Sequence, residues 1–179
     1  MNLLLRFSRA IDAVNERLGY VADALVLLSC AISAGNAFSH YAFDISSNAW
    51  LEIQWYMFGA LVLLGASYTL KKNEHVRVDI VYSNVSTRRQ IGIDIFGFIL
   101  FMLPATAIMT YLSWPIFHNS WLLGEISGNA GGLLRWPIKI FLPIGFALLT
   151  LQGVSELIKR IAMLTGHMKA DLHYERPLQ

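Results

Sequence analysis

The sequence predicts an all-α integral membrane protein with four transmembrane helices, an amphipathic helix that precedes them, and both termini in the cytoplasm. Hydrophobic residues make up 55% of the 179 residues and charged residues only 15%, and the mean hydropathy is +0.49. Soluble domains carry about 25% charged residues, so this chain has too few polar side chains to cover a surface in water. The hydrophobic residues also gather in long blocks, which indicates a bilayer rather than a soluble core.

Four blocks are long and apolar enough to cross a bilayer, which takes roughly 20 residues at 1.5 Å each. They run over about 18–38, 50–70, 91–116 and 137–158, and with the segment 1–17 and a tail over 159–179 they form a single membrane domain. Small residues such as Ser33 and Gly35 follow the first block, as they do in a cleaved secretory signal. The polar and amphipathic segment before that block favours a helix that is retained.

The distribution of Lys and Arg predicts the orientation. All but two of the 14 Lys and Arg residues fall in the segments 1–17, 71–89 and 159–179, and the exceptions are Arg135 and Lys139. Segments rich in Lys and Arg stay in the cytoplasm, and an even number of spans then places both termini inside. The small net charge of +2 gives no sign of a nucleic-acid partner.

Hydrophobic residues recur at steps of three and four in the segment 1–17, with polar residues between them. The hydrophobic set is Leu3, Leu4, Phe7, Ile11, Val14 and Leu18, and the polar set includes Arg6, Arg9, Asp12, Asn15 and Glu16. This spacing is typical of an amphipathic helix that lies flat in the membrane interface and contacts lipid. Packing against a partner subunit is the alternative, and the sequence leaves both open.

Charged residues are rare inside the spans and lie near their ends. Asp23 is about 8 Å from the inner end of the first span, and Asp94 lies in the first turns of the third, where the positive helix end favours an anion. No acidic residue lies at the middle of a span. Ion-coupled transporters place carboxylates or broken helices there, so we do not expect this chain to transport by itself. Pro104 should kink the third span.

The sequence predicts no catalytic site, no metal and no cofactor. It contains neither a phosphate-binding loop nor a nucleophile elbow, and no histidine has metal-ligand spacing to a cysteine or carboxylate. His40 and His118 both fall near outer span ends, so a haem held between them in a four-helix membrane anchor of a redox complex is the alternative. Two interfacial histidines in water are the simpler interpretation.

Two polar regions flank the second span. An aromatic and polar group at its outer end is typical of an interfacial belt: Trp50, Glu52, Gln54, Trp55 and Tyr56. The connector 71–82 after this span packs opposite charges closely. The outer loop 121–136 contains Glu125 and a glycine-rich turn, and it offers a surface to a periplasmic partner.

Short runs along the chain carry a resemblance to a known family. They are Glu-Ile-Gln-Trp-Tyr-Met-Phe-Gly at 52–59, Leu-Gly-Ala-Ser-Tyr-Thr-Leu at 64–70, Asn-Glu-His-Val-Arg-Val-Asp at 73–79, the Gly131-Gly132 turn, Pro137 with Lys139, Pro-Ile-Gly-Phe at 143–146 and Leu-Gln-Gly at 151–153. Over roughly 18–159 the chain resembles the small permease subunit of tripartite ATP-independent periplasmic (TRAP) transporters. The run 74–79 is the most specific part.

The resemblance implies a non-catalytic scaffold in the bacterial inner membrane. Its partners would be a large multi-spanning transporter subunit and a periplasmic substrate-binding protein, and the complex would take up an organic acid driven by a sodium gradient. Neither substrate nor ion would bind to this chain. The candidate structural and partner-contact residues are Glu52, Trp55, Glu74, His75, Arg77, Asp79 and Glu125. In the run 74–79, Glu74 or Asp79 would pair with Arg77 or a lysine and hold the cytoplasmic loop against the helix ends.

Overall fold

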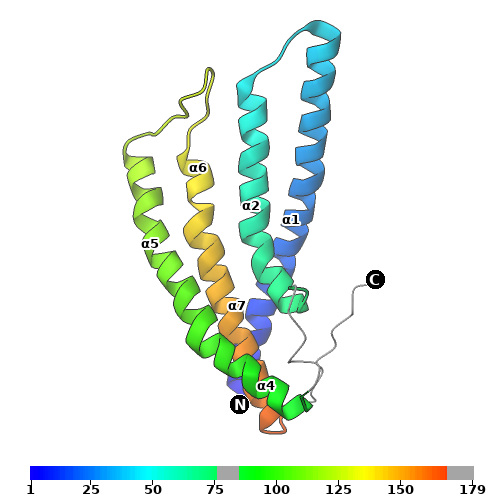
Figure 1. The fold of residues 1–179 in the computed structure, drawn as a ribbon, viewed down its shortest axis with the longest axis vertical. Coiled ribbons are helices and arrows are strands. Elements are labelled where there is room, and N and C mark those ends of the chain that lie inside the picture. The colour runs from blue at the N-terminus through cyan, green and yellow to red at the C-terminus, as the bar shows by residue number, and fades with distance from the viewer. Residues whose placement is uncertain (76–84, 169–179) are drawn as a thin grey trace.

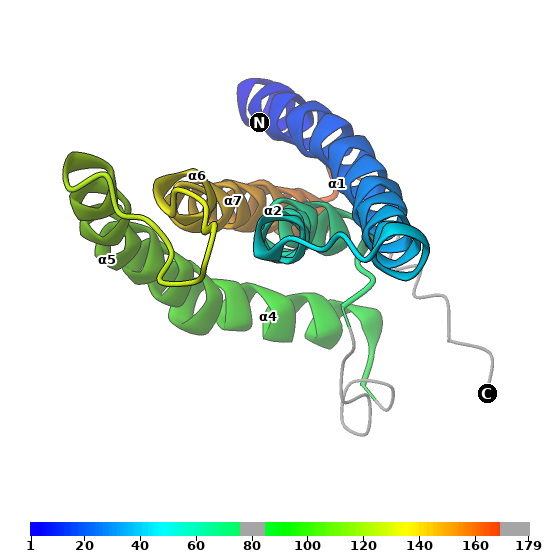
Figure 2. The same ribbon diagram turned by 90° about the horizontal axis from the view of Figure 1, so that it is seen from above.

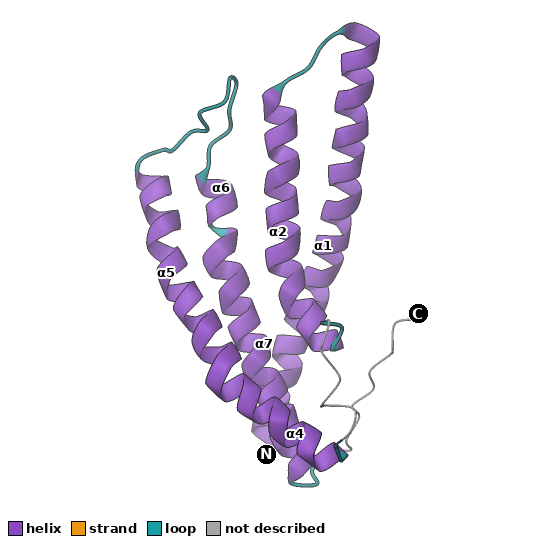
Figure 3. Cartoon of the chain, viewed as in Figure 1, coloured by secondary structure: helices purple, strands orange, loops and turns teal. Residues whose placement is uncertain are grey.

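The computed structural model describes residues 1–75 and 85–168. The regular elements of this part are helices, purple in Figure 3, in the order α1 (Asn2–Phe43), α2 (Asn48–Lys72), α4 (Thr87–Gly97), η1 (Phe98–Met102), α5 (Leu103–Leu122), α6 (Trp136–Lys139) and α7 (Phe141–Leu164). The segment η1 is a stretch of π-helix that joins α4 and α5 into one continuous helix.

The prediction of four apolar spans is confirmed in the described part of the chain. The helices long and apolar enough to cross a membrane are Asn2–Phe43, Asn48–Lys72, Thr87–Leu122 and Trp136–Leu164. Each predicted span lies inside one of them, and each helix extends further, because hydropathy marks the apolar part of a helix and not its ends. The predicted amphipathic helix over 1–17 is the first part of α1 and not a separate element.

Polar residues define the short connection between α1 and α2. Asp44 ends α1 in the left-handed conformation, with φ 55°, and its amide bonds back to the His40 carbonyl at 3.0 Å. Asp and Asn adopt this conformation more readily than other residues with a side chain. Ser47 then caps α2 by accepting a hydrogen bond from the Ala49 amide at 3.3 Å. The other end of α2 is closed in the same way by Asn73, with φ 59°.

Helix α7 lies at the centre of the bundle, where it packs against α1, α2, α4 and α5. Figures 1 and 2 show α1 and α2 side by side on one side of α7 and α5 on the other. We call the end of the bundle with the loops 44–47 and 123–135 the loop end, at the top of Figure 1. The opposite end, where the N-terminus lies, is the terminal end.

Glycines allow the helices to approach closely at two positions. A Cβ atom on Gly145 of α7 would lie 2.7 Å from the Leu63 Cβ and 2.9 Å from the Leu63 carbonyl oxygen of α2. A Cβ atom on Gly19 of α1 would lie 2.7 Å from the Tyr68 ring. Small residues of this kind bring helix backbones together in membrane proteins, where packing rather than hydrophobic burial holds helices side by side.

The predicted break at Pro104 coincides with the π-helix. Pro104 lies at the start of α5, directly after η1, and its ring removes one backbone donor from the helix. The Thr106 hydroxyl donates to the Met102 carbonyl at 2.9 Å and so satisfies a carbonyl of this region. Figures 1 and 2 show that the helix changes direction between α4 and α5, which brings α4 across the terminal end.

The bundle buries polar side chains as well as apolar ones, and its outside is largely apolar. The largest fully buried side chains are Gln152, Asn15, Ser8, Ser67, Ser120 and Ser155. By contrast, Leu27, Tyr111 and Leu123 are 74%, 78% and 81% exposed. Lipid solvates apolar side chains but offers polar groups no hydrogen bonds in the hydrocarbon, so polar groups must find partners inside the protein.

Candidate functional site

Two clusters of polar side chains hold the bundle together, one at each end. The first, the Glu52 cluster, lies at the loop end and comprises Glu52, Glu125, Ser127, Asn129, Arg135, Lys139 and the Leu133 amide. The second, the Gln152 cluster, lies towards the terminal end and comprises Ser8, Asp12, Asn15, Ser67, Gln152, Ser155, Glu156 and Lys159.

The Glu52 carboxylate is the centre of the first cluster. Glu52 is only 3% exposed, although it lies at the start of the second turn of α2, close to the loop end. The carboxylate accepts hydrogen bonds from the Ser127 hydroxyl, from Asn129 Nδ2 at 2.6 Å and from the Leu133 amide at 2.8 Å. Three donors of the loop 123–135 therefore converge on one side chain of α2.

The loop itself is folded as a small hairpin around Glu52. Ile126 and Leu134 form an antiparallel bridge, the Ser127 amide donates to the Leu133 carbonyl at 2.9 Å, and the Arg135 amide donates to the Glu125 carbonyl at 2.8 Å. Gly131 lies at the turn with φ 70°, a conformation that favours glycine. Backbone pairing and the Glu52 carboxylate together give the loop a defined shape.

Glu125 attaches the hairpin to the start of the last helix. Its carboxylate accepts a hydrogen bond from Lys139 of α6 and lies 3.6 Å from the Arg135 guanidinium. The hydrogen bond from Lys139 holds the pKa of Glu125 below its ordinary value, and the positive charge of Arg135 acts in the same direction. A cavity of about 230 Å³ opens between α2, the hairpin and α6, lined by Glu52, Trp55, Tyr56, Ser127, Asn129, Arg135, Ile138 and Lys139.

The predicted contact residues fall into two groups. Glu52, Trp55 and Glu125 all lie at the loop end, where Trp55 is 68% exposed and lines the same cavity as Glu52. Glu74 and His75 are exposed just beyond the far end of α2. Arg77 and Asp79 lie outside the described residues, so the predicted pairing within 74–79 stays a prediction.

The second cluster joins three helices through amide side chains. Asn15 of α1 donates from Nδ2 to Gln152 Oε1 of α7 at 2.6 Å. The Ser67 hydroxyl of α2 donates to Asn15 Oδ1 at 2.8 Å. Because Asn15, Ser67 and Gln152 are each 0% exposed, these bonds fix how α1 and α2 sit on α7.

Charged side chains extend the Gln152 cluster towards the terminal end. Lys159 Nζ lies 2.8 Å from Asp12 and 2.7 Å from Glu156. Arg160 bonds to Glu156 and to Asp94 of α4, each at 3.0 Å. Asp94 was expected near the positive end of its own helix, but α4 begins at Thr87 and has no acidic residue in its first turn. Its partner in the structure is Arg160 of α7.

The Gln152 cluster was missed at the sequence level, although two signals pointed to it. Polar residues recur on α1 at Ser8, Asp12 and Asn15, and on α7 at Gln152 and Glu156, in each case at helical spacing. Asp12 and Asn15 were assigned to the polar side of an amphipathic interfacial helix, with lipid and a partner subunit both left open as contacts. In the structure this polar side faces α7, and the hydrophobic side with Leu3, Phe7 and Val14 is the exposed one.

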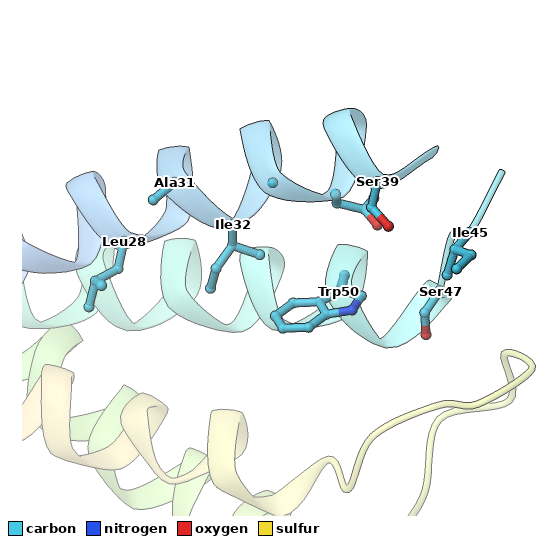
Figure 4. Close-up of a pocket in the computed structure, with 9 residues that line it drawn as sticks. Leu28, Ala31, Ile32, Ser39, Ile45, Ser47 and Trp50 are labelled. Atoms are coloured by element: carbon cyan, nitrogen blue, oxygen red, sulfur yellow. The ribbon is translucent and has the colours of Figure 1, made fainter. Parts of the chain in front are cut away.

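A second cavity, of about 460 Å³, lies between α1 and α2 near the loop end (Figure 4). Leu28, Ala31 and Ile32 line it from α1, and the Trp50 indole lies across it from α2, while Ser39 and Ser47 are found at its outer end. No charged side chain is among the nine residues that line it. The cavity therefore offers no cationic side chain to an anionic ligand.

The two histidines that could hold a haem are carried by helices on opposite sides of the bundle. His40 belongs to α1 and His118 to α5, both are exposed, and Figure 2 shows α1 and α5 separated by α7. His40 lies 4.0 Å from Asp44 within its own helix end. Among the described residues no group of three or more His, Cys, Asp or Glu could hold a metal ion.

The fold and the two clusters define a multi-pass membrane protein in which the polar groups of each cluster bind one another. Comparison with families of known proteins identifies the family to which this membrane protein belongs. Residues 29–163 match the family described as tripartite ATP-independent periplasmic transporters, DctQ component. The chain belongs to this family, which is not enzymatic, and is the small membrane component of a TRAP transporter; the resemblance seen in the sequence is confirmed. Neither the curated proteins nor the solved structures gave a match.

Proposed function

We propose that this chain is the non-catalytic scaffold of its transporter. It packs beside the large multi-spanning subunit and helps to dock the periplasmic substrate-binding protein, while the large subunit carries an organic acid inward with a sodium gradient. The family match over 29–163 is the observation that carries the proposal. The structure supports it because the buried carboxylates at Glu52 and Glu156 are bonded by the chain's own donors.

We infer that the terminal end faces the cytoplasm of the bacterial inner membrane and the loop end faces the periplasm. Lys71 and Lys72 pair with Glu16, and Lys159 pairs with Asp12, all towards the terminal end. Cationic segments stay on the cytoplasmic side. On the loop end the cations Arg135 and Lys139 lie close to Glu125, which reduces their net charge.

The first part of α1 is proposed to contact lipid at the cytoplasmic interface. With 42 residues, α1 is about 63 Å long at 1.5 Å per residue, whereas a bilayer with its head groups is about 40–45 Å thick. An upright α1 would therefore extend well beyond one face of the bilayer, and a first part that lies along the interface avoids this. Leu3, Phe7 and Val14 are 79%, 48% and 50% exposed, which suits insertion of that side into the lipid boundary.

The Glu52 cluster is proposed to shape the docking surface for the substrate-binding protein. It holds a folded hairpin at the loop end, so a partner meets a surface that already has its bound conformation and loses less entropy on binding. Trp55 is the exposed aromatic residue beside it, and aromatic residues often carry much of the binding energy of an interface. At the other end, the segment 74–79 is proposed to hold the cytoplasmic loop against the helix ends.

Copurification tests the scaffold role. A tagged chain is extracted from its native membranes in mild detergent, and the proteins that accompany it are identified. A large multi-spanning protein at a one-to-one ratio supports the proposal. A chain that is repeatedly recovered alone, or only with copies of itself, contradicts it.

Cross-linking tests the docking role. Cells are treated with an amine-reactive cross-linker before extraction, so that a periplasmic protein at the loop end is retained. We expect Trp55→Ala to reduce the recovered periplasmic protein by about tenfold, the effect of losing 1.4 kcal/mol. Trp114→Ala, at an exposed tryptophan in the middle of α5, should leave the yield unchanged. Equal yields from both variants would exclude Trp55 from the docking surface.

A further inference from the structure

One charged side chain inside the spans has no partner among residues 1–75 and 85–168. The predicted spans, all within the described residues, contain five charged side chains: Asp23, Glu52, Asp94, Lys139 and Glu156. Four of them form hydrogen bonds or ion pairs with other described residues. Asp23 is exposed on α1 and forms neither with any described residue.

Contacts between α1 and α2 show how deep Asp23 lies. A Cβ atom on Gly65 would lie 3.7 Å from the Ala22 Cβ, so Asp23 is nearly level with Gly65. Gly65 is seven residues before Lys72, which corresponds to about 10 Å along the helix. Lys71 and Lys72 pair with Glu16 towards the terminal end, so Asp23 lies about 10 Å further into the span than these charges.

The Asp23 side chain cannot carry its charge to the membrane interface by itself. A lysine or arginine at such a depth extends its long side chain to the interface, but the carboxylate of aspartate is too short to do so. Residues three or four positions away are its neighbours on the helix surface, and they are Gly19, Tyr20, Val26 and Leu27, none of them basic. The described part of the chain therefore supplies no donor to the Asp23 carboxylate.

The surface of α1 around Asp23 has the form of a helix-packing seam. Exposed residues recur along it at alternating steps of three and four, at Tyr20, Asp23, Leu27, Cys30, Ala34 and Ala37. This is the period at which two membrane helices pack side by side. The small residues at 30, 34 and 37 would let a second backbone come close, which is how helices associate in lipid.

We propose that this seam, formed by Tyr20, Asp23, Leu27, Cys30, Ala34 and Ala37, binds a transmembrane helix of the large subunit, and that this helix carries an Arg or Lys opposite Asp23. The inference rests on the proposed scaffold function and names the helix face and the charge that make the contact. Charge complementarity selects the occupant. A second copy of this chain would place two Asp23 carboxylates near each other in a symmetric seam, where like charges repel.

Charge variants test the ion pair in the full complex, purified through a tag on this chain. Asp23→Lys places like charges opposite each other, and breaking a buried pair in this way is strongly unfavourable. We expect at least about a tenfold loss of the copurified large subunit, the equivalent of 1.4 kcal/mol, while Asp23→Glu retains most of it. Val21→Ala is the matched control, because Val21 is exposed at the same depth on another side of α1. The melting temperature of the variant chain alone should equal that of the wild type.

Photo-cross-linking tests the seam independently of charge. A photoreactive phenylalanine analogue at Leu27, on the seam, should form an adduct with the large subunit, and the same analogue at Val21 should form fewer. Replacing the opposed Arg or Lys of the large subunit by Asp should restore the complex with Asp23→Lys.

The outcomes separate this inference from the scaffold function. If the wild-type chain copurifies with the large subunit but Asp23→Lys does so equally well, and Leu27 gives adducts only with lipid or with a second copy, the seam is not the contact and the scaffold function stands. If the wild-type chain copurifies with no large subunit, both proposals are wrong.

Discussion

Asn15 and Gln152, which are 137 residues apart in the sequence, share a hydrogen bond of 2.6 Å between two fully buried side chains. The Gln152 amide nitrogen, Nε2, donates to Asp12 at 2.9 Å and to Glu156 at 3.0 Å. One glutamine of α7 thus ties α1 to the last helix at two levels. This connection is what gives the first part of α1 a fixed position on the bundle.

Replacing Gln152 should test how much the buried cluster stabilises the fold. In Gln152→Leu, Asn15 keeps its bond to Ser67 but loses the acceptor for its amide hydrogen, and a buried unsatisfied group costs about 1–3 kcal/mol. We expect a clearly lower midpoint of thermal unfolding in mild detergent. Asn119→Leu replaces an exposed amide of α5 and should change the midpoint little. An unchanged midpoint for Gln152→Leu would mean that water or lipid replaces the lost bond.

Gly145 should be intolerant of any side chain. The added methyl group of Gly145→Ala would lie 2.7 Å from the Leu63 Cβ, so α2 and α7 must move apart. Overpacking of this kind costs about 1–3 kcal/mol. Gly35→Ala is the matched control, since a Cβ atom there meets nothing within 4 Å. The prediction is that unfolding midpoints in detergent fall for the first variant only, and equal midpoints would contradict the close approach of α2 and α7.

Glu52 should control the dynamics of the hairpin. Glu52→Gln replaces one carboxylate oxygen by a donor and removes the charge, so it cannot accept from Ser127, Asn129 and the Leu133 amide together. We expect faster hydrogen exchange in a peptide that contains Leu133, with little change in peptides from α5. Glu74→Gln, at an exposed carboxylate, serves as the control. Exchange at Leu133 that is equally slow in Glu52→Gln would show that backbone pairing alone holds the loop.

Acid should weaken the link between the hairpin and α6. The pKa of Glu125 is lowered in the fold from its ordinary value of 4.5, mainly by the hydrogen bond from Lys139. A lowered pKa stabilises the fold fully above the unfolded value, and this stabilisation is lost as the pH falls through the folded value. The difference in melting temperature between wild type and Glu125→Gln should therefore be constant from pH 7 to about pH 5 and shrink below about pH 4.5. A difference that grows in acid would reverse the assigned direction.

The spans were predictable because each depends on local composition. A block of apolar residues such as 50–70 is recognisable without its neighbours, and the helix found there, Asn48–Lys72, contains all of it. The boundary between the amphipathic segment 1–17 and the first span was not predictable in the same way. The residues before and after Leu18 continue as one helix, since no proline, glycine pair or cap interrupts the chain between them.

The candidate site was only half predictable. Glu52 and Glu125 were singled out because charges beside aromatic residues at a span end are conspicuous in the sequence. Their connection through the hairpin depends on Ser127, Asn129 and the Leu133 amide, and backbone donors leave no trace in residue types. Gln152 was overlooked because a single amide inside an apolar span is not conspicuous until its partners on other helices are known.

The sequence by itself determined that this chain is a membrane protein of four apolar spans and that it belongs with the small TRAP subunits, because length, hydropathy and short runs are properties of the chain alone. Only the tertiary structure decided which side of each helix is covered. A span that faces lipid and a span that faces protein are equally apolar, so rotation about the helix axis is set by the few polar groups that must find partners. Asn15 has its partner, Gln152, on α7, whereas Asp23, on the same helix, is exposed on the outside of the bundle.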